Sequence, residues 1–342
     1  MKKIGILTFH GADNLGAVLQ AYALCEFINK EINFRTEIID YECEEVEKTR
    51  YVQGGNFVKK IPLALYYRIK RHSFDRFRKK KLMLSSNKYK KENIKKCNTM
   101  YSTFVAGSDQ IWNIGCSGND TTYFLDFVEQ EKRKISYAAS MGTTEIEKEK
   151  VDELKNYLNS FDAISVREAS SIKKLDLPKD TSILPDPVFL LTLEQWRRVA
   201  TKRKLKKRYV FVYLIQEDVN VLKSAKKYAK ENECDIIINK KSVEFILNNA
   251  PDHFLWWIEN AEAVFTNSFH GTAFSIIFEK LLGADIILKN GKHNNRIEEL
   301  LDSAGLKECI ISEENYVPKK ANAKKWLNMQ RKKAYEFLKG NI

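Results

Sequence analysis

The stretch that decides the fold is AVFTNSFHGTAFSIIF, residues 263–278. It begins with an apolar run typical of a buried strand, passes through a short polar turn, and continues after Gly271 as an apolar run of helical length. A strand that leads through a short turn into a helix is the repeating unit of α/β proteins with parallel sheets. This stretch therefore predicts a helix that begins at the carboxyl end of a buried strand.

The same alternation of strand-like and helix-like runs extends in both directions from this stretch. It predicts an α/β fold in which helices cover both faces of parallel sheets. The predicted strands are residues 3–9, 36–40, 103–106, 134–140, 163–166, 182–184, 209–215, 235–238, 263–266 and 285–288. The predicted helices are residues 16–29, 145–159, 219–232, 253–260, 271–281 and 296–304.

The segment Pro185-Asp186-Pro187 interrupts this alternation near the middle of the chain. Each proline lacks a backbone donor and restricts the residue before it, so neither a helix nor a central strand continues through this point. We therefore expect two Rossmann-like domains, residues 1–185 and 186–320, with parallel sheets that face a cleft, and a closing helix over 321–342. Ligands bind such sheets at the carboxyl ends of the strands.

Composition excludes several classes of protein. The chain has no apolar run long enough to span a bilayer, and its first apolar run ends after Phe9, too early for a signal peptide. Its six cysteines are far apart and form no C-x-x-C pair, which favours reduced thiols over disulfides or a metal site. We expect a cytoplasmic protein with no metal and no cofactor.

Positive charge is concentrated in one segment. Residues 58–96 contain 15 Lys and Arg against Asp75 and Glu92, which accounts for the formal charge of +13 on the whole chain. Such a segment is either a solvated helical face or a contact for an anionic partner, such as a membrane surface or nucleic acid. No nucleic-acid module accompanies it, so we expect no nucleic acid partner. A peripheral contact with the inner membrane face stays open.

Two loops in the first half place polar residues at predicted strand ends. In TFHGADNLG, Asn14 is either a ligand contact or the cap of the following helix. In GSDQIWN, Ser108 and Asp109 offer hydroxyl and carboxylate groups to a sugar, and Trp112 offers a ring to stack on it. The alternative is a capped helix start with Trp112 in the core.

Two arginines follow apolar runs in places that favour anion binding. Arg167 comes directly after the strand-like run AISV, and a guanidinium fork there suits a carboxylate or phosphate. The alternative for Arg167 is a surface pair with Glu168, which would contribute little. Arg296, after the Asn294-Asn295 pair, offers a second fork in the other half of the chain.

The junction inside residues 263–278 carries the strongest site prediction. The helix that begins near Ser268 offers backbone N–H groups and a positive dipole end to a phosphate. His270 lies where a proton donor is wanted, and Gly271 allows a ligand to approach the backbone closely. The remaining histidines are interpreted as structural.

These junctions, in this order along the chain, resemble the polysaccharide pyruvyl transferase family. The resemblance covers roughly residues 5–306, and GSDQIWN and TNSFHG are highly specific together. The matching strings are N-x-G-x-x-LQAYAL at 14–24, GSDQIWN at 107–113, YAAS at 137–140, SVRE at 165–168, Asp186-Pro187, TNSFHGTAFSIIF at 266–278 and NRI at 295–297.

The resemblance implies a glycosyltransferase-B-like fold, phosphoenolpyruvate as co-substrate and a cell-surface glycan precursor, free or lipid-linked, as acceptor. It places Arg167, His270 and Arg296 at the donor site, and Asp109 near the acceptor. For ketal formation we expect His270 to be the general acid and Asp109 the base, with Arg167 counted as catalytic because it holds the donor's charge.

Two other functions stay open at this point. One is a glycosyltransferase that uses a sugar nucleotide on the same fold. The other is a non-catalytic protein that binds anions or membranes through residues 58–96.

Overall fold

The computed structural model describes residues 3–342 except 52–56, 143–146, 204–206, 287–294 and 313–315, with backbone alone for 57–63. The chain divides into two compact units. The N-terminal unit comprises Met1–Arg71, Asp75–Leu191 and Met329–Ile342, and the C-terminal unit comprises His72–Phe74 and Thr192–Asn328. The boundary expected after residue 185 falls a few residues before this division.

The N-terminal unit is built on a five-stranded parallel sheet with strand order β3-β2-β1-β4-β5. Single bridges from Ile135 to Ala163 and from Ala139 to Val166 join this sheet to a short parallel pair, β6 and β7. The strands are β1 (Ile4–Leu7), β2 (Thr36–Tyr41), β3 (Leu84–Tyr89), β4 (Thr103–Ala106), β5 (Arg133–Ser136), β6 (Ser165–Val166) and β7 (Ser182–Ile183).

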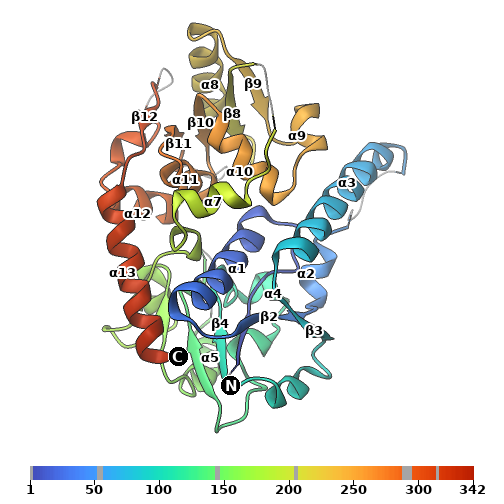
Figure 1. Ribbon diagram of the computed structural model, residues 1–342, viewed down its shortest axis with the longest axis vertical. Coiled ribbons are helices and arrows are strands. Elements are labelled where there is room, and N and C mark those ends of the chain that lie inside the picture. The colour runs from blue at the N-terminus through green and yellow to red at the C-terminus, as the bar shows by residue number, and fades with distance from the viewer. Residues whose placement is uncertain (1–2, 52–56, 143–146, 204–206, 287–294, 313–315) are drawn as a thin grey trace. The chain divides into compact units, whose positions relative to one another are not determined.

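Helix α1 (Leu15–Phe27) is buried over nearly its whole circumference, as its uniformly apolar sequence requires. The long helix α3 (Phe57–Lys81) carries much of the basic segment. Figure 1 shows α1 beside α3 and the strands of this unit. The other helices of this unit are α2 (Glu44–Lys48), α4 (Ile114–Ser117), α5 (Lys148–Leu158) and α6 (Ala169–Lys174), with short helices at Ile28–Ile32, Ile94–Thr99, Thr121–Phe124 and Pro187–Phe189.

The C-terminal unit repeats this plan with strand order β12-β11-β10-β8-β9, parallel except for β12. Its strands are β8 (Tyr209–Tyr213), β9 (Asp235–Ile238), β10 (Ala263–Thr266), β11 (Leu281–Ala284) and β12 (Lys319–Lys320). Its helices are α7 (Leu193–Val199), α8 (Val219–Glu231), α9 (Val243–Leu247), α10 (Pro251–Asn260), α11 (Phe269–Ile277) and α12 (Asn295–Ser303), with a short helix at Lys307–Cys309. Two parallel α/β units confirm the predicted fold class.

The last helix, α13 (Lys324–Asn341), packs its second half on the N-terminal unit. Its Arg331 donates hydrogen bonds to the carbonyls of Phe189 and Leu191, over 3.1 and 3.2 Å. These bonds explain why residues from the two ends of the chain share one unit.

One predicted strand is wrong. The strand expected at 285–288 begins four residues earlier: Leu281–Ala284 pairs in parallel with β10, and residues 287–288 lie outside the described part. The cause is that α11 ends at Ile277 and the left-handed Glu279 (φ 51°) turns the chain directly into the sheet. Strand β3 was also missed, because its solvent-facing residues are polar.

Gly271→Ala should destabilise the protein. A Cβ at this position would lie 2.4 Å from Oγ1 of Thr266, which already donates to the Tyr213 carbonyl and accepts from the amide of Ser268. We expect a loss of about 1–3 kcal/mol, measured by urea and thermal unfolding. Gly340→Ala, which meets open space in α13, is the matched control and should leave the melting temperature unchanged or slightly higher. Equal melting temperatures for wild type and Gly271→Ala would contradict the packing argument.

Candidate functional site

In the N-terminal unit, the chain leaves β1 toward β2 on one side, while β4 lies on the other side of β1. The loops after β1 and β4 therefore diverge from neighbouring strand ends. Such a switch point is where open parallel sheets bind ligands. The two loops are the TFHGADN and GSDQIWN segments that the sequence singles out.

The loop after β1 is held in place by its own polar side chains. Asn14 is exposed and caps α1, with its Oδ1 accepting from the amides of Gly16 (2.9 Å) and Ala17 (3.3 Å). His10 is buried between the Thr8 carbonyl and the Asp40 carboxylate. The capping alternative thus describes Asn14, and His10 is structural as expected.

Ser108 and Trp112 belong to the core. The Ser108 hydroxyl is fully buried and donates to the carbonyl of Ala138. The Trp112 indole is also fully buried, stacks on Phe124 and donates to the carbonyl of Tyr123. This corrects their predicted contacts with an acceptor, because neither side chain presents a surface to a ligand.

Asp109 combines an unusual backbone conformation with a nearly buried carboxylate. Its backbone is left-handed, with φ of 73°, a conformation that is uncommon outside glycine and that Asp tolerates better than most residues. Its side chain is 12% exposed, and Oδ1 accepts from the amide of Gln110 at 2.9 Å. The strand-end geometry thus holds one carboxylate in a fixed orientation at the switch point.

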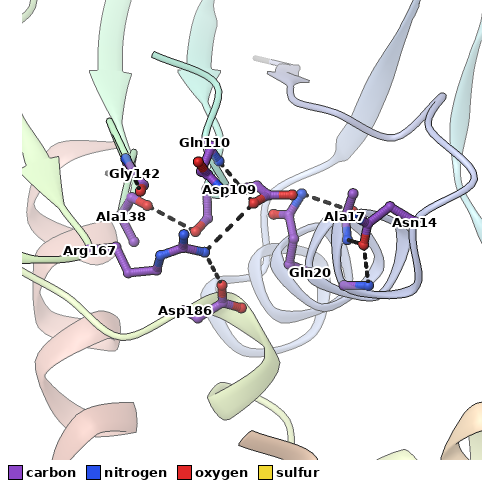
Figure 2. A network of polar contacts seen from close by, with 12 residues as sticks. Asn14, Ala17, Gln20, Asp109, Gln110, Ala138, Gly142, Arg167 and Asp186 are labelled. Atoms are coloured by element: carbon purple, nitrogen blue, oxygen red, sulfur yellow. Dashed lines mark hydrogen bonds and ion pairs between the residues drawn. The ribbon is translucent and has the colours of Figure 1, made fainter. Parts of the chain in front are cut away.

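The guanidinium of Arg167 lies between carboxylates (Figure 2). Its Nη1 is 2.7 Å from Oδ2 of Asp186 and 3.9 Å from Oδ1 of Asp109, and its Nε is 3.5 Å from Oε2 of Glu168. Burial by itself lowers the pKa of Arg167, but the charges of Asp186, Glu168 and Asp109 raise it well above its usual range. Arg167 is therefore a buried, permanently charged centre.

The surroundings of Arg167 weigh against its predicted donor-binding role, which stays a prediction. Three carboxylates surround one guanidinium, so an anionic donor placed there would meet negative charge. The surface pair with Glu168 that the sequence left open is wrong, because the pair is buried. Arg167 also forms an ion pair with Asp109, over 3.9 Å.

The YAAS and SVRE motifs form a hydrogen-bonded network behind this pair. Oε1 of Glu168 accepts from the hydroxyls of Ser140 (2.7 Å) and Ser171 (2.5 Å). The amide of Arg167 donates to the carbonyl of Ala139, so the two motifs are joined by backbone as well. Asp186 caps the short helix Pro187–Phe189 through the amide of Val188. Sequence reasoning missed the roles of Glu168 and Asp186, although both lie in motif strings.

The C-terminal unit has its own switch point, between β8 and β10. Asn267, directly after β10, accepts from the amide of Ile215 and donates to the carbonyl of Gln216, so it fixes the loop after β8. Asn239, directly after β9, makes a paired contact with both backbone groups of Leu214. Buried asparagines therefore shape this strand edge.

Ser268 and His270 stand at this edge. Ser268 caps α11 by accepting from the amide of Gly271 at 3.3 Å, and His270 is the second residue of the helix, partly exposed, with its ring edge-on to Phe269. The predicted reason for Gly271 is corrected: the glycine is required because a Cβ would collide with Thr266, so close packing explains it without a ligand.

Arg296 is the second residue of α12 and is partly exposed, while Asn294 lies outside the described residues. His270 and Arg296 thus belong to the C-terminal unit, and Asp109 and Arg167 belong to the N-terminal unit. Within the described residues no group of His, Cys, Asp and Glu side chains could hold a metal ion. None of the helices in these ranges is both long and apolar enough to cross a membrane.

Both units are thus Rossmann-like, and each carries polar residues at the carboxyl edge of its parallel sheet, which is where open α/β sheets bind ligands. The family model for polysaccharide pyruvyl transferases matches residues 14–280. The chain therefore belongs to the polysaccharide pyruvyl transferase family. No curated protein matches the chain closely enough to count as a relative.

Several solved structures are similar to the chain over nearly its full length. The UDP-GlcNAc 2-epimerase from Neisseria meningitidis bound to UDP-GlcNAc is 8% identical and has a TM-score of 0.45, covering 96% of this chain and 99% of its own. The UDP-N-acetylglucosamine 2-epimerase from Rickettsia bellii is 12% identical, with a TM-score of 0.43 and coverage of 99% and 95%. The E. coli ADP-heptose LPS heptosyltransferase II is 9% identical, with a TM-score of 0.37 and coverage of 99% and 98%.

Asp186→Asn should destabilise the N-terminal unit strongly. The substitution keeps the shape of the side chain but removes the charge nearest the buried guanidinium of Arg167, and breaking such a pair costs about 3–5 kcal/mol. Glu194→Gln removes one partner of the partly exposed Arg197 and should cost no more than about 1 kcal/mol. Urea and thermal unfolding measure both changes. Similar losses in the two variants would mean that the buried network does not hold the unit together.

Proposed function

We propose that the protein transfers a pyruvyl group from phosphoenolpyruvate to two hydroxyls of a sugar in a cell-surface polysaccharide precursor, forming a ketal. Family membership supports a transferase that modifies polysaccharides. The observation that carries the finer proposal is the Asp109 carboxylate, held at the switch point by Arg167 and the Gln110 amide. A fixed, slightly exposed carboxylate suits the removal of a proton from a sugar hydroxyl.

Donor activation is assigned to the C-terminal unit. Phosphoenolpyruvate carries a phosphate and a carboxylate, and Arg296 together with the N-terminal end of α11 offers positive groups for them. His270, on the first turn of α11, gives a proton to C3 of the donor, which makes C2 electrophilic. Ser268 and Gly271 hold this turn in shape rather than acting on the donor.

The remaining steps balance without another reactant. A first acceptor hydroxyl attacks C2 and gives its proton to Asp109 as the new C–O bond forms. The bond between C2 and the phosphate oxygen breaks, and phosphate leaves. A second hydroxyl of the same sugar then attacks C2 and closes the ketal ring. The two hydroxyl protons replace the proton that His270 supplied to C3 and the one that the phosphate carries away.

Replacing His270 should abolish transfer without unfolding the protein. We expect His270→Ala to lower kcat at least about a hundredfold, because general acid catalysis contributes that much or more. The exposed His72→Ala is the matched control and should retain wild-type kcat. The measurement is release of phosphate and formation of the pyruvyl ketal from phosphoenolpyruvate, followed by mass spectrometry of the glycan.

The roles of Asp109 as the base and of Arg296 in binding phosphoenolpyruvate are tested in the same assay. Asp109→Asn should lower kcat at least about a hundredfold, because general base catalysis contributes that much or more, and Arg296→Ala should raise the KM for phosphoenolpyruvate sharply, because one of the positive groups for the donor is lost. Wild-type kcat in His270→Ala would reject the acid role. Thermal stabilisation by a nucleotide sugar but not by phosphoenolpyruvate would favour the sugar-nucleotide-dependent glycosyltransferase instead.

We also propose a peripheral contact between the basic helix α3 and an anionic membrane, which would hold the enzyme near a lipid-linked acceptor. Exposed Arg68, Arg76 and Lys79 recur at helical spacing on one face of α3, next to the exposed Leu65. Arg78 differs from them: it is buried and bonded to Asp13 and to the carbonyl of Ala12. The segment is therefore partly an anchor for the loop after β1 and partly an open basic surface.

Binding to vesicles should depend on this face. The double variant Arg76→Gln with Lys79→Gln should weaken binding to phosphatidylserine-containing liposomes about thirtyfold at low salt, since each basic residue contributes about 1 kcal/mol. Lys226→Gln with Lys230→Gln, two exposed lysines of α8, is the control. Co-sedimentation that is equal in both variants, or insensitive to salt, would reject the membrane contact.

A further inference from the structure

A hollow of about 460 Å³ opens at the carboxyl ends of β2 and β3, in the N-terminal unit. We name it the β2–β3 groove and define it by the residues that line it within segments 41–48, 90–92 and 117–120. None of these residues belongs to the acid, base or donor positions assigned above. The groove therefore needs a separate explanation.

The charge of the groove is opposite to that of the protein as a whole. Six carboxylates and three lysines line it, in a chain with a formal charge of +13. The lysines are paired with carboxylates already: Lys48 lies 3.1 Å from Glu44, and Lys90 lies 3.3 Å from Glu42. Lys88 and Arg50, next to the groove, also pair with Glu42 and Glu47, so only a small excess of negative charge remains. This excess disfavours phosphate and carboxylate ligands, whereas carboxylate oxygens are good acceptors for hydroxyl groups.

A second, independent observation concerns Ser117, the last residue of α4. The residue is only 2% exposed, and its Oγ has no hydrogen-bond partner among the described residues. Ser117 lines the groove. A buried hydroxyl without a hydrogen-bond partner destabilises the folded state by about 1–3 kcal/mol. A neutral ligand whose own hydroxyl supplies that partner therefore gains binding free energy at Ser117.

The position of the groove connects it to Asp109. Helix α4 directly follows the GSDQIWN loop, and Asp13 of the loop after β1 is linked through Arg50 to Glu47 of the groove. Strand β2 is separated from β4 by β1 alone, so the groove begins on the order of 10 Å from the end of β4. One sugar ring does not span that distance, but two or three linked sugars do.

We propose that the β2–β3 groove binds further, non-anionic sugar units of the acceptor, so that the enzyme recognises an oligosaccharide rather than the single sugar that it modifies. This inference rests on the proposed function, because it takes Asp109 as the end of the groove where transfer occurs.

Ser117→Ala separates a binding role from a structural one. Because the hydroxyl has no protein partner, its removal should leave the melting temperature unchanged or raise it, while binding of non-anionic oligosaccharides weakens about tenfold. Binding is measured on an array of neutral, amine-bearing and anionic oligosaccharides without phosphoenolpyruvate. Ser303→Ala, whose hydroxyl bonds to the Leu300 carbonyl in α12, is the control and should bind like the wild type.

A charge reversal tests whether the β2–β3 groove prefers non-anionic glycans to anionic ones. Glu92→Lys should shift binding toward anionic glycans, whereas Glu149→Lys, an exposed position on α5, should not. Preference of the wild type for anionic glycans, absence of binding to any non-anionic oligosaccharide, or wild-type binding by Ser117→Ala would each overturn the proposal. A lower melting temperature for Ser117→Ala would also overturn it, since the hydroxyl would then be structural.

The array also keeps the two proposals apart. If phosphoenolpyruvate is not the donor, transfer fails in every variant while binding in the groove is unaffected. If transfer occurs but the groove is not a sugar site, Ser117→Ala keeps the wild-type ratio of KM values for a single sugar and for the same sugar extended by two units.

Discussion

The N-terminal unit depends on one buried ion pair. Arg167 and Asp186 meet at 2.7 Å with almost no exposure to solvent, and Glu168 and Asp109 complete the ring of negative groups around the guanidinium. Such an assembly is costly to desolvate and stable only when every member has partners. Ser140 of the YAAS motif and Ser171, three residues after the SVRE motif, provide them for Glu168, and the start of the helix Pro187–Phe189 provides one for Asp186. The same contacts that stabilise the unit therefore orient Asp109.

This coupling explains why the motifs of the N-terminal unit are so rich in small polar residues. The serines of β5 and β6 exchange hydrogen bonds between Ser136 and Ser165, both fully buried. Larger side chains would separate the strands, and apolar ones would leave backbone groups unpaired. The motif residues thus form a packed polar core, in which the side chain of Asp109 keeps a small exposed fraction.

The fold could be predicted from the sequence because apolar periodicity and β–α alternation are local signals. The strand over 263–266 and the helix over 219–231 follow directly from them. The partners of side chains were harder to predict, because they depend on contacts between residues far apart in the sequence. Nothing near Arg167 in the sequence reveals that Asp186 neutralises its charge. Burial of Trp112 and the packing reason for Gly271 belong to the same class. His270 and Asp109 could be singled out because unusual residues follow a strand end.

Helix α13 has a consequence for how the protein is made. Arg331 donates to the carbonyls of Phe189 and Leu191, so the first unit of the chain is completed by a residue that is synthesised 142 and 140 positions later. Domains generally acquire structure in order as the chain leaves the ribosome. Here the segment that ends at Leu191 must wait until residue 331 has been synthesised, so a ribosome that stalls between these two points leaves the unit incomplete.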